Sequence, residues 1–363
     1  MKVCIDGVEI TQCKNCKYHE VHEIVLVDDF DHDFGTYCSL VEDEHDSYER
    51  YTYSGRINKR MIGGDDWSVS EAEVPDWCPF VLKHYDEQLD VVLNSPEWNT
   101  MLKTIDENPF GSQKLIVDHG KRHAEKVFSA AKGFLMDITK YKFNNFYYND
   151  HWCSTQRDER LLAFAAMLHD VGASVDSTSG HTAMSVKIAK ETFLSRITLI
   201  DEDKEVILKA IANHSDGTKL VQEAKATLVR EKGKVFSSPL RSELAVPVAL
   251  LLGDKLDVTA DRVNDNYLKT LGEDPEFDKF CEAAKKIKKV EFKFVDPGEN
   301  KNGDSLPVTR AELHYTVDKG FDFNALTFWP SCICVPRMVA KDILGLRSFV
   351  VLVNGQRKYL SKF

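Results

Sequence analysis

The chain has 363 residues, of which 43% are hydrophobic and 10% aromatic, so it can bury a core and does not have the composition of a disordered polypeptide. Its formal net charge of −11 argues against non-specific coating of nucleic acid, which requires a basic surface. No run approaches the roughly 20 apolar residues that span a bilayer, and the start lacks the apolar core of a signal peptide. We therefore expect a cytoplasmic protein with no membrane partner.

Residues 1–85 are polar, acidic and rich in Cys, His and Tyr, and short apolar runs among them predict strands. Cys13 and Cys16 form a Cys-x-x-Cys pair, and Cys38 and Cys78 supply two further thiols. Four cysteines satisfy a closed tetrahedral zinc site, which can hold together a module with little core. We expect a zinc-ribbon-like β module with a structural zinc ion; free thiols with an accidental pair are the alternative. The rival fourth ligands are His19, His22 and His32.

Residues 86–280 show the apolar periodicity of helices and are expected to form the helical core of a multi-domain protein. The expected helices follow Ser112, Asp158, either Ser179 or Gly180, Asp201 and Ser242, and the first runs to about Tyr141. Several imidazoles and carboxylates lie on or near the apolar faces of these helices, and such groups are ligands of divalent cations. These polar residues are His123, His169, Asp170, His181, His214 and Asp254.

Residues 286–363 return to patterns that alternate between apolar and polar side chains, which is typical of strands. The expected elements are strands at 290–295, 311–317 and 348–353 and a helix at 336–344. Asn354-Gly355 predicts a tight hairpin turn after the last of these strands. We expect a small α+β domain that could recognise substrate, form a homodimer interface or brace the helical core.

The order of the polar residues in the helical domain resembles the HD-domain superfamily of metal-dependent phosphohydrolases. His123 in His-Ala-Glu-Lys-Val, the pair His169-Asp170 after Ala-Met-Leu, and Asp254 in Leu-Gly-Asp-Lys match its H…HD…D pattern. The resemblance covers roughly residues 112–270. It implies that these four side chains bind one divalent ion.

Two further histidines extend the resemblance to members of the superfamily that bind two metals. His181 and His214 lie where the HD-GYP phosphodiesterases and the di-iron oxygenases related to inositol oxygenase have additional ligands. The resemblance implies that Asp170 bridges to a second ion held by these histidines. The Gly-Tyr-Pro motif is absent and Asn213-His214 replaces a histidine pair, so we do not expect a cyclic-di-GMP enzyme.

The chemistry implied by this resemblance is hydrolysis of a small-molecule phosphate ester, with a nucleotide as the expected substrate. A bound ion (Mn, Mg, Fe, Ni, Co or Zn; one or two) lowers the pKa of water and acts as a Lewis acid. Lys255 and Arg262 follow Asp254 at helical spacing and could contact the phosphate, and His119 could donate a proton to the leaving group. A di-iron oxygenase and a non-catalytic nucleotide-binding regulatory protein are the alternatives.

Overall fold

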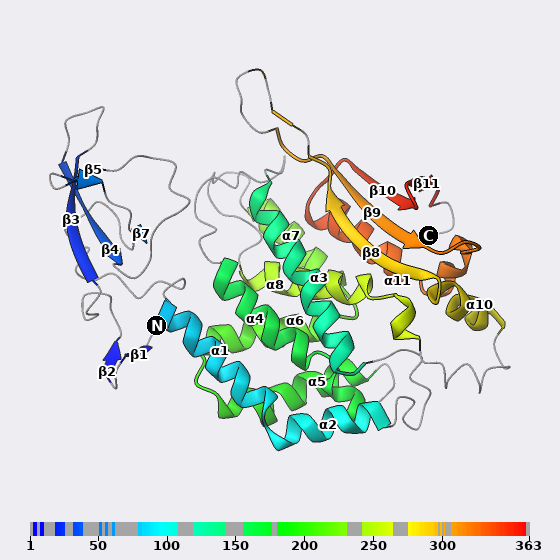
Figure 1. The fold of residues 1–363 in the computed structure, drawn as a ribbon, viewed down its shortest axis with the longest axis horizontal. Helices are drawn as coiled ribbons and strands as arrows, with labels where there is room; N and C mark the ends of the chain where they lie inside the picture. The colour runs from blue at the N-terminus through cyan, green and yellow to red at the C-terminus, as the bar shows by residue number, and fades with distance from the viewer. Residues whose placement is uncertain are drawn as a thin grey trace. The chain divides into compact units, whose positions relative to one another are not determined.

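The computed structural model describes residues 79–107, 119–141, 155–175, 180–230, 242–263, 275–296, 298–299, 301 and 306–360, together with short strands between residues 3 and 61. The chain divides into two compact units, Met1–Gln88 and Leu89–Phe363; Figure 1 shows the elements of both. Among the described helices, none has the length and apolar character needed to cross a membrane.

The described part of the first unit consists of strands, apart from the start of α1 (Pro79–Leu93). Its larger sheet has the order β6-β5-β3-β4-β7. The strands are β1 (Val3–Ile5), β2 (Val8–Ile10), β3 (His19–Val25), β4 (His32–Cys38), β5 (Tyr51–Thr52), β6 (Gly55–Arg56) and β7 (Arg60–Met61). Cys13, Cys16 and Cys78 lie outside the described residues, and Cys38 is described only as the last residue of β4. The zinc site therefore stays a prediction.

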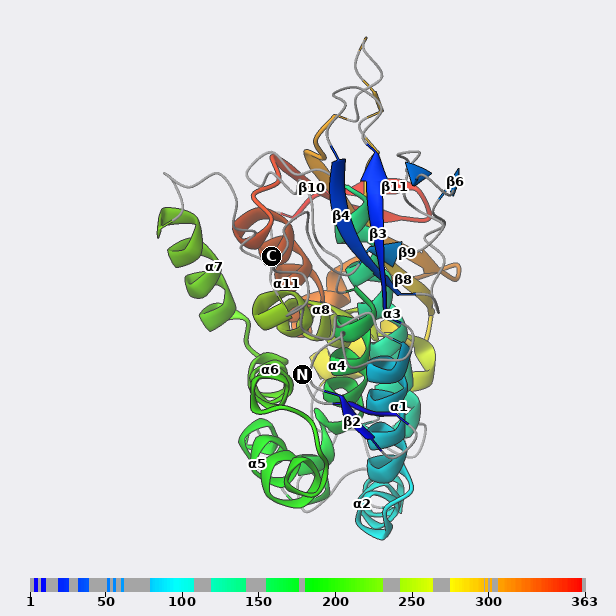
Figure 2. The ribbon, with the colours of Figure 1, turned by 90° about the vertical axis from the view of Figure 1, so that its left-hand side faces the viewer.

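The second unit is built around α8 (Ser242–Leu256), whose residues from Leu244 to Leu252 are apolar apart from a proline. A helix that is apolar on all sides belongs in a core, and α8 contacts α3, α4, α6 and α11. Figure 2 shows α5, α6 and α7 along one side of this unit, beside α4 and α8. The surrounding helices are α2 (Pro96–Glu107), α3 (Lys121–Lys140), α4 (Thr155–Leu168), α5 (His181–Ile188), α6 (Asp201–Asn213), α7 (Thr218–Arg230), α10 (Pro275–Ala284) and α11 (Ser331–Met338).

Helix α3 begins later than the sequence predicts. Its first residue is Lys121, because Gly120 is the N-cap with extended backbone angles, φ −80° and ψ −169°. Ser112, the expected cap, lies outside the described residues. Helix α5 begins directly after Gly180, as expected. Helices α6 and α8 begin one residue earlier than expected, with Asp201 and Ser242 as their first residues, and α4 begins at Thr155, so Asp158 lies in its first turn. The helical core itself is confirmed.

The C-terminal part of the second unit is a four-stranded sheet with the order β11-β10-β9-β8. Its strands are β8 (Ile287–Phe294), β9 (Arg310–Val317), β10 (Ser348–Val353) and β11 (Gln356–Lys358). Strands β9 and β10 are parallel, and the connection between them carries η7 (Phe323–Phe328), α11 and η8 (Val339–Ile343). The expected strands and the hairpin at Asn354-Gly355 are confirmed; both turn residues have positive φ. The helix expected from Pro336 begins earlier, at Ser331.

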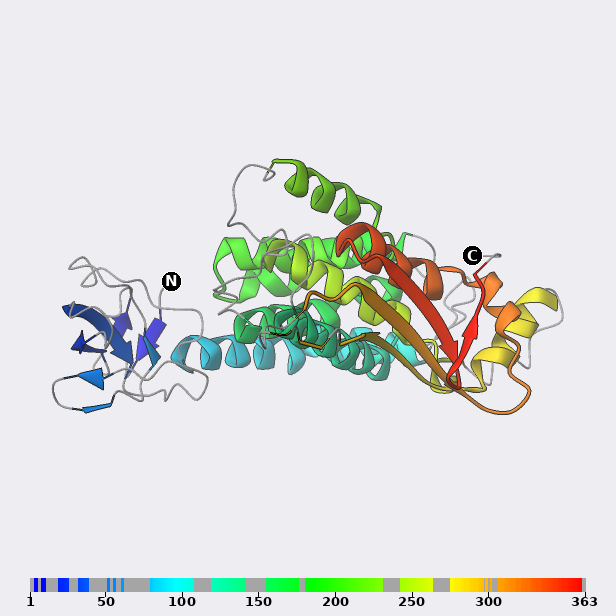
Figure 3. The ribbon, with the colours of Figure 1, turned by 90° about the horizontal axis from the view of Figure 1, so that it is seen from above.

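One face of this sheet shares a core with the helices. Phe292 and Phe294 on β8 place their rings 6.0 and 6.1 Å from the ring of Phe134 on α3. Strand β9 alternates buried and exposed residues, as a sheet with one buried face requires. Figure 3 shows the strands of this sheet lying across the helices. The sheet therefore supports α3, the helix that carries His123.

Candidate metal centre

Three helices of the core end beside the residues expected to bind metal. His169 and Asp170 directly follow α4, His214 directly follows α6, and Asp254 lies in the last turn of α8. The aligned peptide groups of a helix give its C-terminus a partial negative charge of about half a unit. Helix ends of this polarity favour a cation nearby.

The helix ends also orient two of the histidines. The Nδ1 of His169 lies 2.8 Å from the main-chain oxygen of Ala166, and the Nδ1 of His214 lies 2.7 Å from that of Ile211. These oxygens belong to the last turn of a helix, where carbonyls have no partner within the helix. Because a carbonyl only accepts hydrogen bonds, each Nδ1 carries a proton, and each Nε2 is the ring nitrogen that faces the other histidines of the centre. Burial lowers the pKa of His214, which favours the neutral ring.

His123 is oriented by a carboxylate that the sequence analysis did not single out. The His123 ring is buried in the first turn of α3, and its Nδ1 lies 2.7 Å from Oδ2 of Asp257. Burial and the charge of Arg262 oppose protonation, but the hydrogen bonds with Asp254 and Asp257 outweigh them and raise the pKa of His123 above 6.5. The surroundings of this ring thus stabilise positive charge, as a cation site must.

Asp170 lies between two groups of histidines. Its Oδ2 is 3.2 Å from Nε2 of His169 and 3.5 Å from Nε2 of His123. Its Oδ1 is 3.4 Å from Nε2 of both His181 and His214. The carboxylate is buried, which raises its pKa, but the histidines around it, His169 first among them, hold that pKa well below its ordinary value. An ionised carboxylate in this position can face two cations, one through each oxygen.

The distances between histidines test whether a cation fits. The Nε2 atoms of His169 and His123 are 3.2 Å apart, and those of His214 and His181 are 3.4 Å apart. Two ring nitrogens whose lone pairs face each other at these distances repel unless a proton or another cation lies between them. Among the described residues, two sets of three side chains have potential ligand atoms within 4.8 Å of one another. They are His123, His169 and Asp254, and His119, Asp170 and His181.

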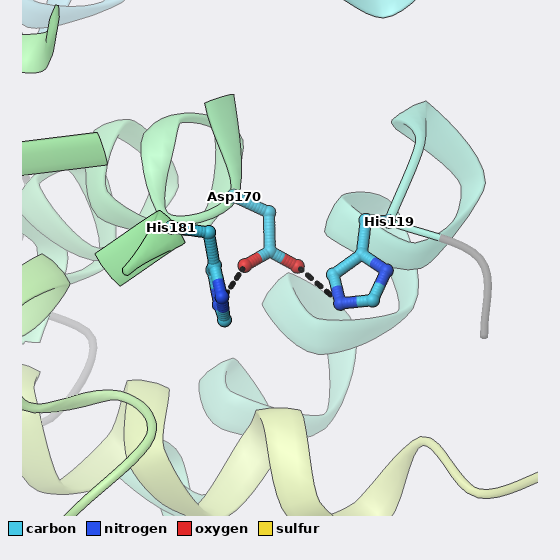
Figure 4. Close-up of side chains that lie close together, drawn as sticks. All are labelled: His119, Asp170 and His181. Atoms are coloured by element: carbon cyan, nitrogen blue, oxygen red, sulfur yellow. Dashed lines mark ion pairs between the residues drawn. The ribbon is translucent and has the colours of Figure 1, made fainter. Parts of the chain in front are cut away.

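His119 immediately precedes the N-cap of α3 and faces the same carboxylate. Its Nε2 lies 3.9 Å from Oδ2 of Asp170, on the opposite side of the carboxylate from His181, as Figure 4 shows. Burial lowers the pKa of His119 to about 4, although the charge of Asp170 acts in the other direction. The ring is therefore neutral at pH 7 and can still donate one N–H.

The two cations expected near the substrate phosphate bind Asp254 in this structure. The Nζ of Lys255 bonds Oδ2 of Asp254, while the guanidinium of Arg262 lies 3.5 Å from Oδ1 and 3.1 Å from Nε2 of His123. Burial raises the pKa of Asp254, but Lys255, His123 and Arg262 together hold it well below its ordinary value. The sequence therefore placed both cations near the centre, but it did not predict that they would bind Asp254.

Two glycines allow the backbones that carry the site to approach each other. A Cβ on Gly172 would lie 2.2 Å from the main-chain oxygen of His181 and 2.4 Å from the main-chain nitrogen of Ser185. This contact joins the turn η3 (Val171–Ser174), just after Asp170, to the start of α5. A Cβ on Gly253 would lie 2.6 Å from the main-chain oxygen of Val127, where α8 meets α3. Any side chain at either glycine would push the segments apart.

Comparison with known families agrees with this geometry. The family model of the HD domain matches residues 120–234. The match supports the HD superfamily for this part of the chain, and members of that family are generally metal-dependent hydrolases. No curated protein matches the chain. The chain thus combines a segment similar to the HD domain with a candidate His/Asp site for a divalent metal.

Proposed function

We propose that this protein is a metal-dependent hydrolase of a small phosphate ester, with a nucleotide as the substrate class that the family resemblance favours. The observation that carries the proposal is the position of Asp170, whose two oxygens face different groups of histidines. Such a carboxylate suits a centre with two divalent ions, and a pair of ions suits the attacking and leaving oxygens of a phosphate ester.

The proposed ligand sets follow from these contacts. The first ion would be held by His123, His169, Asp170 and Asp254, and the second by Asp170, His181 and His214. When bound, a divalent ion lowers the pKa of water and withdraws charge from phosphoryl oxygens. The chain itself contributes imidazoles whose Nδ1 atoms are bonded to main-chain oxygens and whose Nε2 atoms face the centre, together with an ionised carboxylate.

Three further residues have proposed roles toward the substrate. Lys255 and Arg262 are the proposed contacts for the phosphate, and each has to share its positive charge between Asp254 and the substrate. His119 is the proposed proton donor to the leaving oxygen, because its neutral ring faces Asp170 from the side opposite His181.

The direct test combines metal analysis with phosphate release. The full chain should hold one or two divalent ions at the centre and release phosphate from some nucleotides when Mn²⁺, Mg²⁺, Ni²⁺ or Co²⁺ is added. The double variant His169→Ala with Asp170→Ala should lose both properties. His314→Ala is the control, since His314 lies on β9 and bonds Glu312 instead of the centre. Equal metal occupancy of the double variant and the wild type would contradict the proposal.

A di-iron oxygenase is the second candidate, and the mixed set of four histidines and two aspartates supports it because that set also suits iron. Purification with tightly bound iron and turnover that consumes oxygen would favour this alternative. Phosphate release with manganese, magnesium, nickel or cobalt would favour the hydrolase.

The N-terminal cysteines carry a separate proposal. A zinc ion bound by Cys13, Cys16, Cys38 and Cys78 would be structural. Replacing Cys13 and Cys16 with serine should remove one zinc per chain and leave the ions of the central site in place. Unchanged zinc content in that variant would contradict the assignment.

A further inference from the structure

His123 differs from two other histidines of the centre in the partner of its Nδ1. His169 and His214 donate from Nδ1 to main-chain oxygens at the ends of their own helices. His123 instead bonds Oδ2 of Asp257, at 2.7 Å and from a part of the chain 134 residues away. A hydrogen bond to an ionised carboxylate is roughly twice as strong as one between neutral groups. The orientation of the His123 ring therefore depends on Asp257.

Asp257 is itself held in place by several contacts. Its carboxylate is buried, and its Oδ1 accepts a hydrogen bond of 3.2 Å from the hydroxyl of Thr259. The Nζ of Lys126 lies 3.9 Å from the same oxygen. Its main-chain oxygen accepts a hydrogen bond of 2.9 Å from Arg262. If the carboxylate turned away from His123, it would lose its contacts with Thr259 and Lys126, while the bond from Arg262 holds the main chain of Asp257 in place.

The segment that carries Asp257 is tied to the same helix as His123. Lys126 bonds the hydroxyl of Thr259 at 3.0 Å and the carboxylate of Asp261 at 2.6 Å. Arg122 donates to the main-chain oxygen of Asp261. Arg122 and Lys126 flank His123 on α3, so the segment and the ring keep their relative positions.

Two aspartates of one segment thus face the two nitrogens of one ring. Oδ1 of Asp254 lies 3.3 Å from Nε2 of His123, and Oδ2 of Asp257 lies 2.7 Å from Nδ1. The first aspartate is a proposed metal ligand, and the second is on the far side of the ring. The spacing Asp-x-x-Asp at the end of α8 produces this arrangement.

We propose that Asp257 is a positioning residue that holds His123 with the proton on Nδ1 and the lone pair of Nε2 directed at the metal centre. The proposal rests on the proposed function, because it requires His123 to be a metal ligand. A carboxylate behind a ligating histidine fixes the tautomer and makes the ring a stronger ligand. Asp257 touches neither the ion nor the substrate.

The experiment compares Asp257→Asn with Asp261→Asn in the full chain. Asp261 is a matched control because its carboxylate is 53% exposed and does not bond His123. Asp261→Asn keeps the bond from Arg122 to the main-chain oxygen and the bond from Lys126 to Thr259, which still hold the segment against α3. Calorimetric titration with Mn²⁺ should show an affinity roughly 10- to 100-fold weaker in Asp257→Asn and an unchanged affinity in Asp261→Asn. Thermal unfolding reports whether both variants remain folded.

A second measurement does not depend on the variants. In the zinc-loaded wild type, ¹⁵N NMR of the histidine rings should find the His123 proton on Nδ1 and none on Nε2. A proton on Nε2 overturns the proposal, and so does wild-type Mn²⁺ affinity in Asp257→Asn when His123→Ala has lost binding. If His123→Ala binds Mn²⁺ as tightly as the wild type, the failure lies in the metal assignment of the proposed function, and this inference falls with it.

Discussion

Gly253 allows α3 and α8 to pack closely beside the metal centre, and we expect Gly253→Ala to separate them. The added Cβ would lie 2.6 Å from the main-chain oxygen of Val127 and 2.8 Å from the Cβ of Ala131, while ordinary contact begins at 3.4 Å. Neither atom can rotate away, since both are fixed by the backbone of α3. In a close-packed interior the two helices must therefore move apart by roughly 0.6–0.8 Å.

This displacement should weaken metal binding, because Asp254 follows Gly253 on α8 and His123 lies one turn before Val127 on α3. Metal–ligand distances tolerate changes of about 0.2 Å. We expect the affinity for Mn²⁺ to fall by about tenfold or more. Over-packing destabilises the folded state by roughly 1–3 kcal/mol, whereas alanine in place of a helical glycine stabilises it by about 1 kcal/mol. The free energy of unfolding should therefore fall by only about 0–2 kcal/mol.

Calorimetric titration with Mn²⁺ and thermal unfolding of the full chain provide the assay. Gly133→Ala is the matched control, because Gly133 also lies on α3 and its added Cβ would have no atom within 4 Å. The control should gain about 1 kcal/mol of stability and bind Mn²⁺ normally. If Gly253→Ala also bound Mn²⁺ normally, the distance between α3 and α8 would not control the site, and the argument would be refuted.

Three further predictions follow from the charges and contacts of the core. Lys255→Met removes a positive charge beside Asp254, so Mn²⁺ should bind roughly tenfold more tightly while phosphate release slows; weaker Mn²⁺ binding in a calorimetric titration would contradict this. Asp203 is fully buried and forms an ion pair with Arg157. Asp203→Ala should therefore lower the free energy of unfolding, measured by urea denaturation, by roughly 3 kcal/mol. A decrease below about 1 kcal/mol would count against a stabilising pair. Removal of bound metal should lower the melting temperature. Compared with the protein at an ion concentration 100 times the Kd, the free energy of unfolding should fall by about 2.7 kcal/mol. An unchanged melting temperature after chelation would exclude preferential binding of the ion to the folded chain.

The sequence predicted which helices and strands the second unit contains better than it predicted where they begin and end. Periodicity identified α8 and β9 because each buries a continuous apolar stripe or face. The start of α3 was wrong because it depends on the extended backbone of Gly120, and several polar residues upstream could equally cap a helix. The start of α11 was wrong because Pro336 was taken as a first residue, whereas it lies inside the helix.

In the candidate site, the sequence predicted the proposed metal ligands but not every side chain that bonds them. The H…HD…D order brought His123, His169, Asp170 and Asp254 together correctly as neighbours, since each lies on a predicted helix or directly after one. Asp257 was missed because its partner is 134 residues away, and locally it looks like a solvated residue beyond a helix. A carboxylate three residues after a suspected ligand was the signal that could have identified it.

The position of Asp170 also bears on how the chain reaches its native state. The groups around its carboxylate come from α3, α4, α5 and α6, and His123 and His169 alone are separated by 46 residues. A compact state that buried this carboxylate before the helices had docked correctly would leave its negative charge with neither water nor partners. Several distant segments must therefore dock correctly before the carboxylate can be buried without a large desolvation free energy. The residue proposed for chemistry thus also disfavours compact states in which the helices are assembled wrongly.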